Sequence, residues 1–206
     1  NLLCKSFDSQ EDISGHVEKI KDSIGYQTNA NEDDEHSLEA SHDDYINIKE
    51  DSSKDDLTQA LDKDGLLATI QAAIKHKENY PMSVIRIDID KFALFNETNG
   101  KIMGDAVLKH ISKIITNFVK GSDIVSRIEN DEFILVLPKT ANDSALNVAE
   151  ELRKKVAGLS LKKKTSQTAA KVTVSMGMSE ITPGISFVDA LEKAKTALNR
   201  SIDLTV

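Results

Sequence analysis

The chain has 206 residues, 39% of them hydrophobic, which is enough for one domain with a substantial core plus a tail. It contains no apolar run of about 18 residues and no visible signal peptide, so we expect no membrane-spanning helix, and its single cysteine excludes an internal disulfide. The net charge of −8 comes from residues 1–64, which hold 18 acidic and 6 basic residues, whereas residues 65–206 hold 16 and 20, and an acidic tail argues against nucleic-acid binding.

The first segment, residues 1–26, contains a short apolar stripe at helical spacing, formed by Ile13, Val17, Ile20 and Ile24. The stripe fits a surface helix that docks on the body, or a coupling helix that leads from an upstream sensor. Residues 27–54 are acidic and poor in large apolar groups, and they indicate a linker. The chain begins with Asn rather than Met, so we expect a fragment or a processed form.

From residue 55 onward the pattern is that of a folded domain, with helical and strand periodicities in alternation. Helices are predicted around 66–74, over 107–118, over 142–157 with Asn142 or Asp143 as cap and Gly158 as stop, and after a capping box at Ser186 and Asp189. Strands are predicted over 83–89 and 172–178. This interspersed order indicates an α/β or α+β fold with a mixed sheet.

The stretch RIENDEF, residues 127–133, joins two short apolar runs and predicts a β-hairpin. Its tip carries Glu129, Asn130, Asp131 and Glu132, three acids around one amide. Such a tip either faces a cation or is solvated.

Two further acids, Asp88 and Asp90, lie on one face at the carboxyl end of the 83–89 strand. If this strand lies beside the hairpin, Asp88 and Asp131 converge. Two carboxylates and a backbone carbonyl suit Mg²⁺, which prefers oxygen ligands and can assist displacement at phosphorus. Acids are also common at strand ends and hairpin tips, so composition alone leaves a plain surface site open.

Asn96 and Asp105 each have two interpretations. Asn96 is either a turn former before the Asn99-Gly100 turn signal or an amide that reads a base edge. Asp105 is either a capping residue near a helix start, where the macrodipole favours an anion, or a carboxylate that hydrogen-bonds a ligand.

Four stretches together resemble the GGDEF domain of diguanylate cyclases over about residues 55–206. They are DDLTQALDKDGLL, IDIDKFALFNETNGKIMGDAVL, SDIVSRIENDEF and VTVSMGMSEI. The resemblance implies a palm-type fold in which helices surround a central mixed five-stranded sheet. It also implies a bacterial cytoplasmic protein that condenses two GTP molecules into cyclic di-GMP, with one GTP bound by each of two facing domains.

By position, the resemblance assigns Mg²⁺ to Asp88, the carbonyl of Ile89 and Asp131. It assigns activation of the attacking hydroxyl to Glu132, with Asp131 beside it, and guanine recognition to Asn96 and Asp105. All of these side chains are present.

The chain departs from the family pattern at the hairpin tip and at the expected phosphate-binding cations. The two glycines of the signature turn are Glu129 and Asn130 here, which adds bulk, charge and a strained φ if the turn needs the left-handed region. The family's lysine after the paired aspartates falls on Ala93, and its lysine and arginine in the last helix fall on Ile202 and Val206. The loss of three charged hydrogen bonds, at roughly 1.5–3 kcal/mol each, would lower binding or rate more than ~10³-fold.

Two other family motifs have drifted. The product-inhibition motif Arg-x-x-Asp reads KGSD, in which Lys120 provides a point charge but no bidentate fork, and Asp123 is kept. An Asn-Arg pair becomes Asp62 and Lys63.

Two functional hypotheses therefore stand. The first is a degenerate GGDEF domain in cyclic di-GMP signalling that is catalytically impaired and acts as a regulatory, GTP-sensing or dimerisation module. The second is an active diguanylate cyclase that uses Mg²⁺. The implied partners are GTP or cyclic di-GMP, a second copy of the domain, and an upstream sensor or a downstream phosphodiesterase domain; a scaffold that binds only proteins is a third, minor reading.

Overall fold

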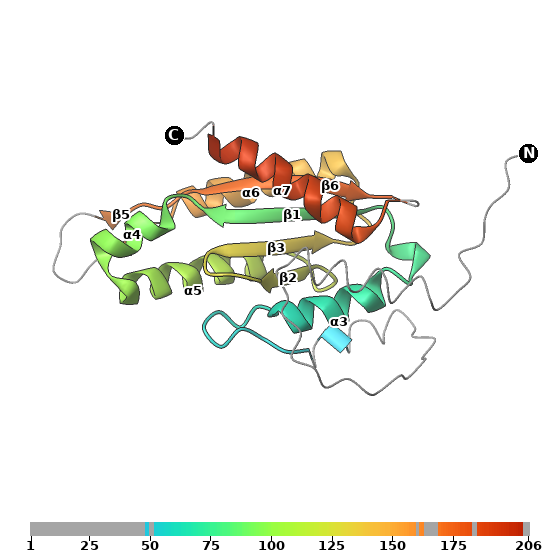
Figure 1. Ribbon diagram of the computed structural model, residues 1–206, viewed down its shortest axis with the longest axis horizontal. Coiled ribbons are helices and arrows are strands. Elements are labelled where there is room, and N and C mark those ends of the chain that lie inside the picture. The colour runs from blue at the N-terminus through green and yellow to red at the C-terminus, as the bar shows by residue number, and fades with distance from the viewer. Residues whose placement is uncertain (1–47, 50–51, 160, 163–168, 183–184, 204–206) are drawn as a thin grey trace, which may run out of the picture.

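The computed structural model describes residues 48–49, 52–159, 161–162, 169–182 and 185–203 (Figure 1). The helix predicted within residues 1–26 and most of the linker predicted over 27–54 lie outside the described residues.

The main sheet is built from four strands in the order β2-β3-β1-β6, and every neighbouring pair is antiparallel. The strands are β1 (Met82–Ile89), β2 (Ile124–Arg127), β3 (Glu132–Leu137) and β6 (Val174–Ile181). The predicted hairpin is confirmed, because β2 and β3 pair directly through the turn over residues 128–131. Both predicted strands are also present, as β1 and β6.

A fifth segment lies at the edge of the sheet without forming a strand. Leu61 makes an isolated parallel bridge with Ser126 in β2, and its amide donates to the carbonyl of Val125 at 3.0 Å. The amide of Arg127 in turn donates to the carbonyl of Leu61 at 2.8 Å. The described sheet is thus four-stranded and antiparallel, where we predicted five mixed strands, and its one parallel contact is this bridge. A separate antiparallel pair consists of β4 (Leu161–Lys162) and β5 (Ala169–Ala170).

Helices cover both faces of the sheet (Figure 1). One face packs on α3 (Lys63–Ala73) and α7 (Phe187–Asp203), and the other on α5 (Lys101–Phe118) and α6 (Asn142–Ala157). Alternation along β1 produces the two layers, since Val84 joins the core beside α7 whereas Ile85 joins the core beside α5 and α6. The hydrophobic periodicity of these helices therefore predicted the layers correctly.

Gly177 in β6 allows α7 to lie directly against the sheet. A Cβ atom at this position would lie 2.1 Å from both the carbonyl oxygen of Ala194 and the amide nitrogen of Leu198. This close approach carries the last turns of α7 past the carboxyl end of β1, which is the end that bears the predicted carboxylates (Figure 1).

One helix was not predicted. Helix α4 (Phe92–Asn99) follows β1 at once, starting after Lys91 in the left-handed region at φ 55° and ending at Gly100 at φ 84°. The sequence showed the Asn99-Gly100 break but not the helix before it, because only nine residues lie between the end of the strand and the break. A short 3₁₀ helix, η1 (Lys77–Asn79), precedes β1.

The structure confirms some of the predicted helix caps and contradicts others. Helix α6 begins at Asn142 with Ala141 as N-cap and no side-chain cap, so the prediction of Asn142 or Asp143 as cap was wrong. The amide of Asn142 instead donates to a carboxylate oxygen of Glu180 from β6, a tertiary contact that replaces the local cap. Gly158 is the C-cap as predicted. At α7 the amide of Asp189 donates to the hydroxyl of Ser186 at 3.1 Å, which confirms the capping box.

Candidate functional site

The predicted carboxylates come together where β1 ends beside the hairpin. The antiparallel register places Asp88 of β1 directly opposite Glu132 of β3. Asp131 is the residue just before Glu132, at the hairpin tip. Side chains opposite one another in a sheet have Cβ atoms ~4.5–5.5 Å apart. The sheet pairing thus gathers three acids that lie more than forty positions apart in the sequence.

These acids interact strongly. Burial raises the pKa of Asp88 from its ordinary value of 3.8 to about 7, and the charges of Asp131, Glu132 and Asp90 push it in the same direction. The pKa of Asp131 is also raised, chiefly by burial, although a backbone hydrogen bond works against this shift. Without a cation, therefore, the negative charges destabilise one another and Asp88 readily holds a proton near neutrality.

Glu132 has a partner that the sequence analysis missed. Its Oε1 accepts a hydrogen bond from Nε of Arg86, two residues before Asp88 on the same strand. Arg86 is 2% exposed, and the side chain of Glu132 is 16% exposed. The available signal was the charge of Arg86 in the middle of the apolar alternation of residues 83–89.

Asp90 is fixed by the neighbouring strand. Its two carboxylate oxygens accept hydrogen bonds from the hydroxyls of Thr173 and Ser175, the latter at 2.6 Å. The amide of Asp90 also donates to the carbonyl of Thr173 at 3.0 Å. Asp90 therefore ties the end of β1 to β6, and these contacts occupy both of its oxygens.

Ion pairs and hydrogen bonds from charged residues hold the hairpin tip in place. Glu129 forms an ion pair with Lys63 at the start of α3, with Nζ and Oε1 3.6 Å apart. Arg127 donates from Nη2 to the carbonyl of Asn130 at 2.7 Å and from Nη1 to both carboxylate oxygens of Asp55 at 3.0 Å. Burial alone would raise the pKa of Asp55, but hydrogen bonds from Thr58 and Arg127 bring it below its ordinary value.

The expected backbone strain at the tip is absent. Among the described residues other than glycine, positive φ occurs at Gln59, Lys91 and Lys139. Neither Glu129 nor Asn130 adopts it, so the replacement of the two glycines costs no left-handed backbone strain in this turn. Glu129 still adds bulk and a negative charge at the tip.

Asn96 and Asp105 lie at the contact of α4 with α5. Asn96 is inside α4, so the interpretation as a turn former was wrong, and α5 begins at Lys101 without a side-chain cap, so Asp105 does not cap it. A Cβ atom at Gly104 would lie 1.8 Å from Oδ1 of Asn96. This buried oxygen has no hydrogen-bond partner among the described residues. Asn96 therefore packs against the residue adjacent to Asp105, and both remain candidates to contact a ligand.

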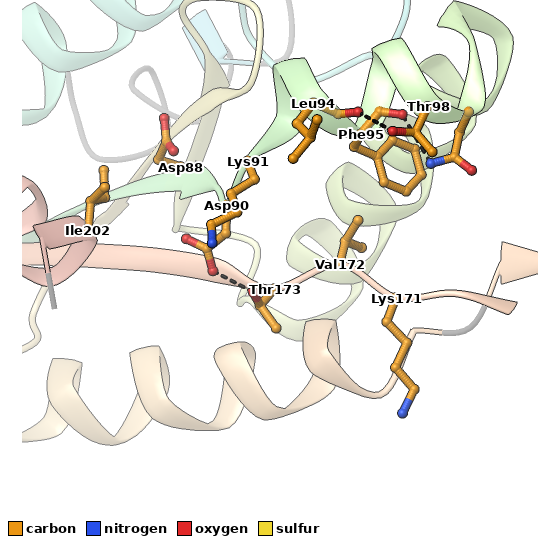
Figure 2. A pocket seen from close by; sticks show the side chains of 11 residues that line it. Asp88, Asp90, Lys91, Leu94, Phe95, Thr98, Lys171, Val172, Thr173 and Ile202 are labelled. Atoms are coloured by element: carbon orange, nitrogen blue, oxygen red, sulfur yellow. Dashed lines mark hydrogen bonds between the residues drawn. The ribbon is translucent and has the colours of Figure 1, made fainter. Parts of the chain in front are cut away.

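A pocket of about 490 Å³ opens beside the carboxylates, between the end of β1, α4, the segment before β6 and the end of α7 (Figure 2). Ile202 of α7 contributes a wall next to Asp88, and the amino group of Lys171 points away from this cluster (Figure 2). Its lining residues are Asp88, Asp90, Lys91, Leu94, Phe95, Thr98, Asn99, Lys171, Val172, Thr173 and Ile202. Asn96, Asp105 and Asp131 are not among them, so this pocket adjoins the predicted site rather than containing it.

The model of the diguanylate cyclase GGDEF domain matches residues 52–202, which is most of the chain. The chain belongs to this GGDEF family. The match covers all the strands of the main sheet, the carboxylate cluster and both halves of the Asn96–Gly104 contact. The predicted family and fold class are thereby confirmed.

Curated relatives and solved structures agree with this assignment. The chain is 35% identical to diguanylate cyclase A of Treponema denticola over 135 residues, which are 66% of the chain and 34% of that protein. It is 34% identical to diguanylate cyclase DosC of Escherichia coli over 60% of the chain and 27% of that protein. The chain thus spans about a third or less of these relatives.

Two solved structures are similar at 27% identity. The GGDEF domain of DgcB from Caulobacter crescentus, solved with c-di-GMP, has a TM-score of 0.68 and covers 73% of the chain and 90% of that domain. Diguanylate cyclase SiaD of Pseudomonas aeruginosa, solved with its activator SiaC, has a TM-score of 0.70, and the match covers 79% of the chain and 62% of the SiaD chain.

The KGSD segment of this GGDEF domain is a closed turn. The carboxylate of Asp123 accepts a hydrogen bond from the amide of Lys120 at 2.7 Å, and the amide of Asp123 donates to the carbonyl of Lys120 at 3.0 Å. Asp123 is 6% exposed, and burial raises its pKa. Lys49 donates to the carbonyls of Gly121 and Asp123. The retained aspartate therefore has a structural role in this turn.

The donor set of this GGDEF domain fits a hard divalent cation. Asp88 and Asp131 provide carboxylate oxygens whose mutual repulsion a cation would relieve, and Mg²⁺ prefers one or two carboxylates with its remaining positions open. Within the described ranges, no three His, Cys, Asp or Glu side chains are arranged to hold a metal. The same part of the chain contains no helix suited to crossing a membrane.

Proposed function

We propose that this chain is a regulatory GGDEF module of cyclic di-GMP signalling that binds GTP with Mg²⁺ but turns it over slowly or not at all. The domain would extend over residues 55–206, and the segments before it would connect it to an upstream sensor. Its output would pass through nucleotide occupancy and through contact with a second GGDEF domain or a downstream phosphodiesterase domain.

The observation that carries this proposal is the position of Ile202. This side chain lies in the pocket wall beside Asp88, at the place where the family resemblance implies a phosphate-binding lysine. Ala93, the other expected lysine, is exposed on α4 and ends at a methyl group. Each missing charged hydrogen bond removes roughly 1.5–3 kcal/mol of stabilisation from a triphosphate. Two such losses correspond to a factor of about 10²–10⁴ in binding or rate.

The side chains kept at the site support binding rather than turnover. Asp88, Asp131 and the carbonyl of Ile89 would hold Mg²⁺, which when bound offsets the charge of the phosphates. Asn96 and Asp105 would contact the guanine edge between α4 and α5. Glu132, which the resemblance makes part of the catalytic apparatus, is engaged through Oε1 by Nε of Arg86.

One observation favours the alternative, an active diguanylate cyclase. The acids of the signature turn are all present, and the charge of Asp131 helps to raise the pKa of Asp88, which a bound cation would offset. Lys91 and Lys171 also line the pocket beside them. Lys91 could replace part of the missing positive charge, whereas the amino group of Lys171 points away from the carboxylates (Figure 2).

A titration and an assay on the same protein separate the two functions. We expect isothermal titration with GTP and Mg²⁺ to show binding, and mass spectrometry after incubation to show no accumulation of cyclic di-GMP. Accumulation of product would establish the cyclase instead. Absence of both heat and thermal stabilisation by GTP would contradict the sensing role and leave a module that acts only through protein contacts.

A further inference from the structure

Arg86 is an unusual residue for its position. It lies in the middle of β1, paired with Ile134 on β3 and with Gly177 on β6, on the face that packs against α7. Its neighbours on that face include the buried side chains Val84 and Ile134. A guanidinium that is 2% exposed in such surroundings requires a counter-charge, because an uncompensated buried ion is strongly destabilising.

Glu132 provides that counter-charge. Nε of Arg86 donates to Oε1 of Glu132, whereas Nη1 of Arg86 is buried without a partner among the described residues. The guanidinium therefore depends on this carboxylate, which it holds toward the protein interior. Asp88, although directly opposite Glu132 in the register, forms no ion pair with Arg86 in the described structure.

We propose that Arg86 is a positioning residue that withdraws Glu132 from the carboxylate cluster, so that only Asp88 and Asp131 are left to bind a divalent cation. Without the ion pair, Glu132 would be a third acid beside Asp88 and Asp131. With it, the described residues contain no arrangement of three acids suited to a metal. Arg86 thus lowers both the number of oxygen ligands and the net negative charge at the site.

This inference rests on the metal site of the proposed function, but it requires neither GTP binding nor turnover. It follows from the register and the ion pair, and it predicts that this chain, although it keeps all the signature acids, binds Mg²⁺ through only two of them. A purely structural role for Arg86 predicts only lower stability when it is replaced. The positioning role predicts a gain in metal affinity.

The test is calorimetric titration of the full 206-residue chain with Mg²⁺ alone, and with Mn²⁺ as a second probe. We expect Arg86→Met, which introduces an apolar side chain of similar length, to bind the cation at least about tenfold more tightly than the wild type. The double variant Arg86→Met with Glu132→Leu should return to within about threefold of the wild type. Arg86→Lys, which keeps the charge, should remain near the wild type.

Four outcomes would overturn the inference. The first is an unchanged affinity in Arg86→Met, and the second is a gain that persists in the double variant. If circular dichroism shows that Arg86→Met does not fold, the double variant, which removes both charges of the pair, still decides. As the third outcome, a cation affinity about tenfold or more below that of the wild type in this double variant would show that Glu132 is already a ligand in the wild type. The fourth is that neither wild type nor variant binds the cation, in which case GTP binding is judged separately by the titration described above.

Discussion

Lys63 and Glu129 form an ion pair across the gap between α3 and the hairpin tip. Both residues occupy positions where the chain departs from the family pattern, so two substitutions that look unrelated in the sequence meet in space. Because Glu129 is 54% exposed, the pair is expected to stabilise the fold by less than about 1 kcal/mol. The pair draws the carboxylate of Glu129 toward α3.

The first prediction concerns this tip. Glu129→Gly should lower the free energy of unfolding by no more than about 1 kcal/mol, since the lost contact is exposed and φ at this position is not positive. It should strengthen GTP binding, because it removes a negative charge beside the carboxylates. Urea denaturation and calorimetry measure the two effects. Lys63→Met is the matched control. It breaks the same ion pair but leaves the negative charge of Glu129 in place, so a gain in GTP affinity in this variant would contradict the explanation.

The second prediction concerns the stability of the Arg86–Glu132 pair. Glu132→Leu alone leaves a buried guanidinium without its counter-charge and should cost about 3–5 kcal/mol. The double variant Arg86→Met with Glu132→Leu should be close to the wild type in stability, because a buried ion pair can be exchanged for apolar side chains at little cost. A double-mutant cycle by chemical denaturation gives the coupling. Additive losses in the cycle would show that the two side chains do not depend on each other.

The third prediction concerns Gly104. Replacing it with alanine puts a Cβ atom 1.8 Å from Oδ1 of Asn96, so Asn96 or α5 must move. We expect a loss of about 1–3 kcal/mol in the free energy of unfolding and weaker binding of GTP. Gly121→Ala is the control, because no atom lies within 4 Å of a Cβ there and its φ is not positive. Unchanged GTP affinity in a folded Gly104→Ala variant would remove Asn96 from the binding site.

The fourth prediction is a pH dependence that Mg²⁺ reverses. The folded state raises the pKa of Asp88 to about 7, so it binds a proton that the unfolded chain has already lost above about pH 4. This group therefore destabilises the metal-free fold progressively as pH rises from about 4 to about 7, and the effect levels off above that. Asp131, whose pKa is also raised, acts in the same direction.

Thermal melts across this range, with and without Mg²⁺, measure the effect. Stabilisation by Mg²⁺ should grow as pH rises, because the cation competes with the proton for Asp88. In Asp88→Asn the decline in stability should be markedly smaller. An identical pH profile in wild type and Asp88→Asn would rule out this carboxylate as its source.

The fifth prediction restores the missing cations. Ala93→Lys combined with Ile202→Lys should increase GTP affinity by about 10²-fold or more, since two charged hydrogen bonds become available to the phosphates. Ala93→Met with Ile202→Leu keeps the apolar character and should have no such effect. If calorimetry shows equal gains in both double variants, hydrophobic contact rather than charge determines affinity at these positions.

Sequence alone determined the local features of this protein. The alternation of residues 83–89, the turn between two apolar runs at 127–133 and the stripe of α5 predicted their elements correctly, because each depends on a period read within a few residues. Family motifs at fixed spacing assigned Asp88, Asp131 and Asn96 to one predicted site. The capping signal at the start of α6 gave a wrong prediction, because a distant residue makes the contact instead. The amide of Asn142 donates to a carboxylate oxygen of Glu180.

Only the tertiary structure decided which charges meet. Arg86 and Glu132 are 46 positions apart and become partners through the register of β1 with β3, which no local pattern encodes. The same holds for Lys63 with Glu129 and for Ile202 beside Asp88, which depends on the close approach of α7 at Gly177. Electrostatic interactions depend on distance and burial. The sequence could therefore name the charged groups of the site, whereas their pairing required the folded sheet.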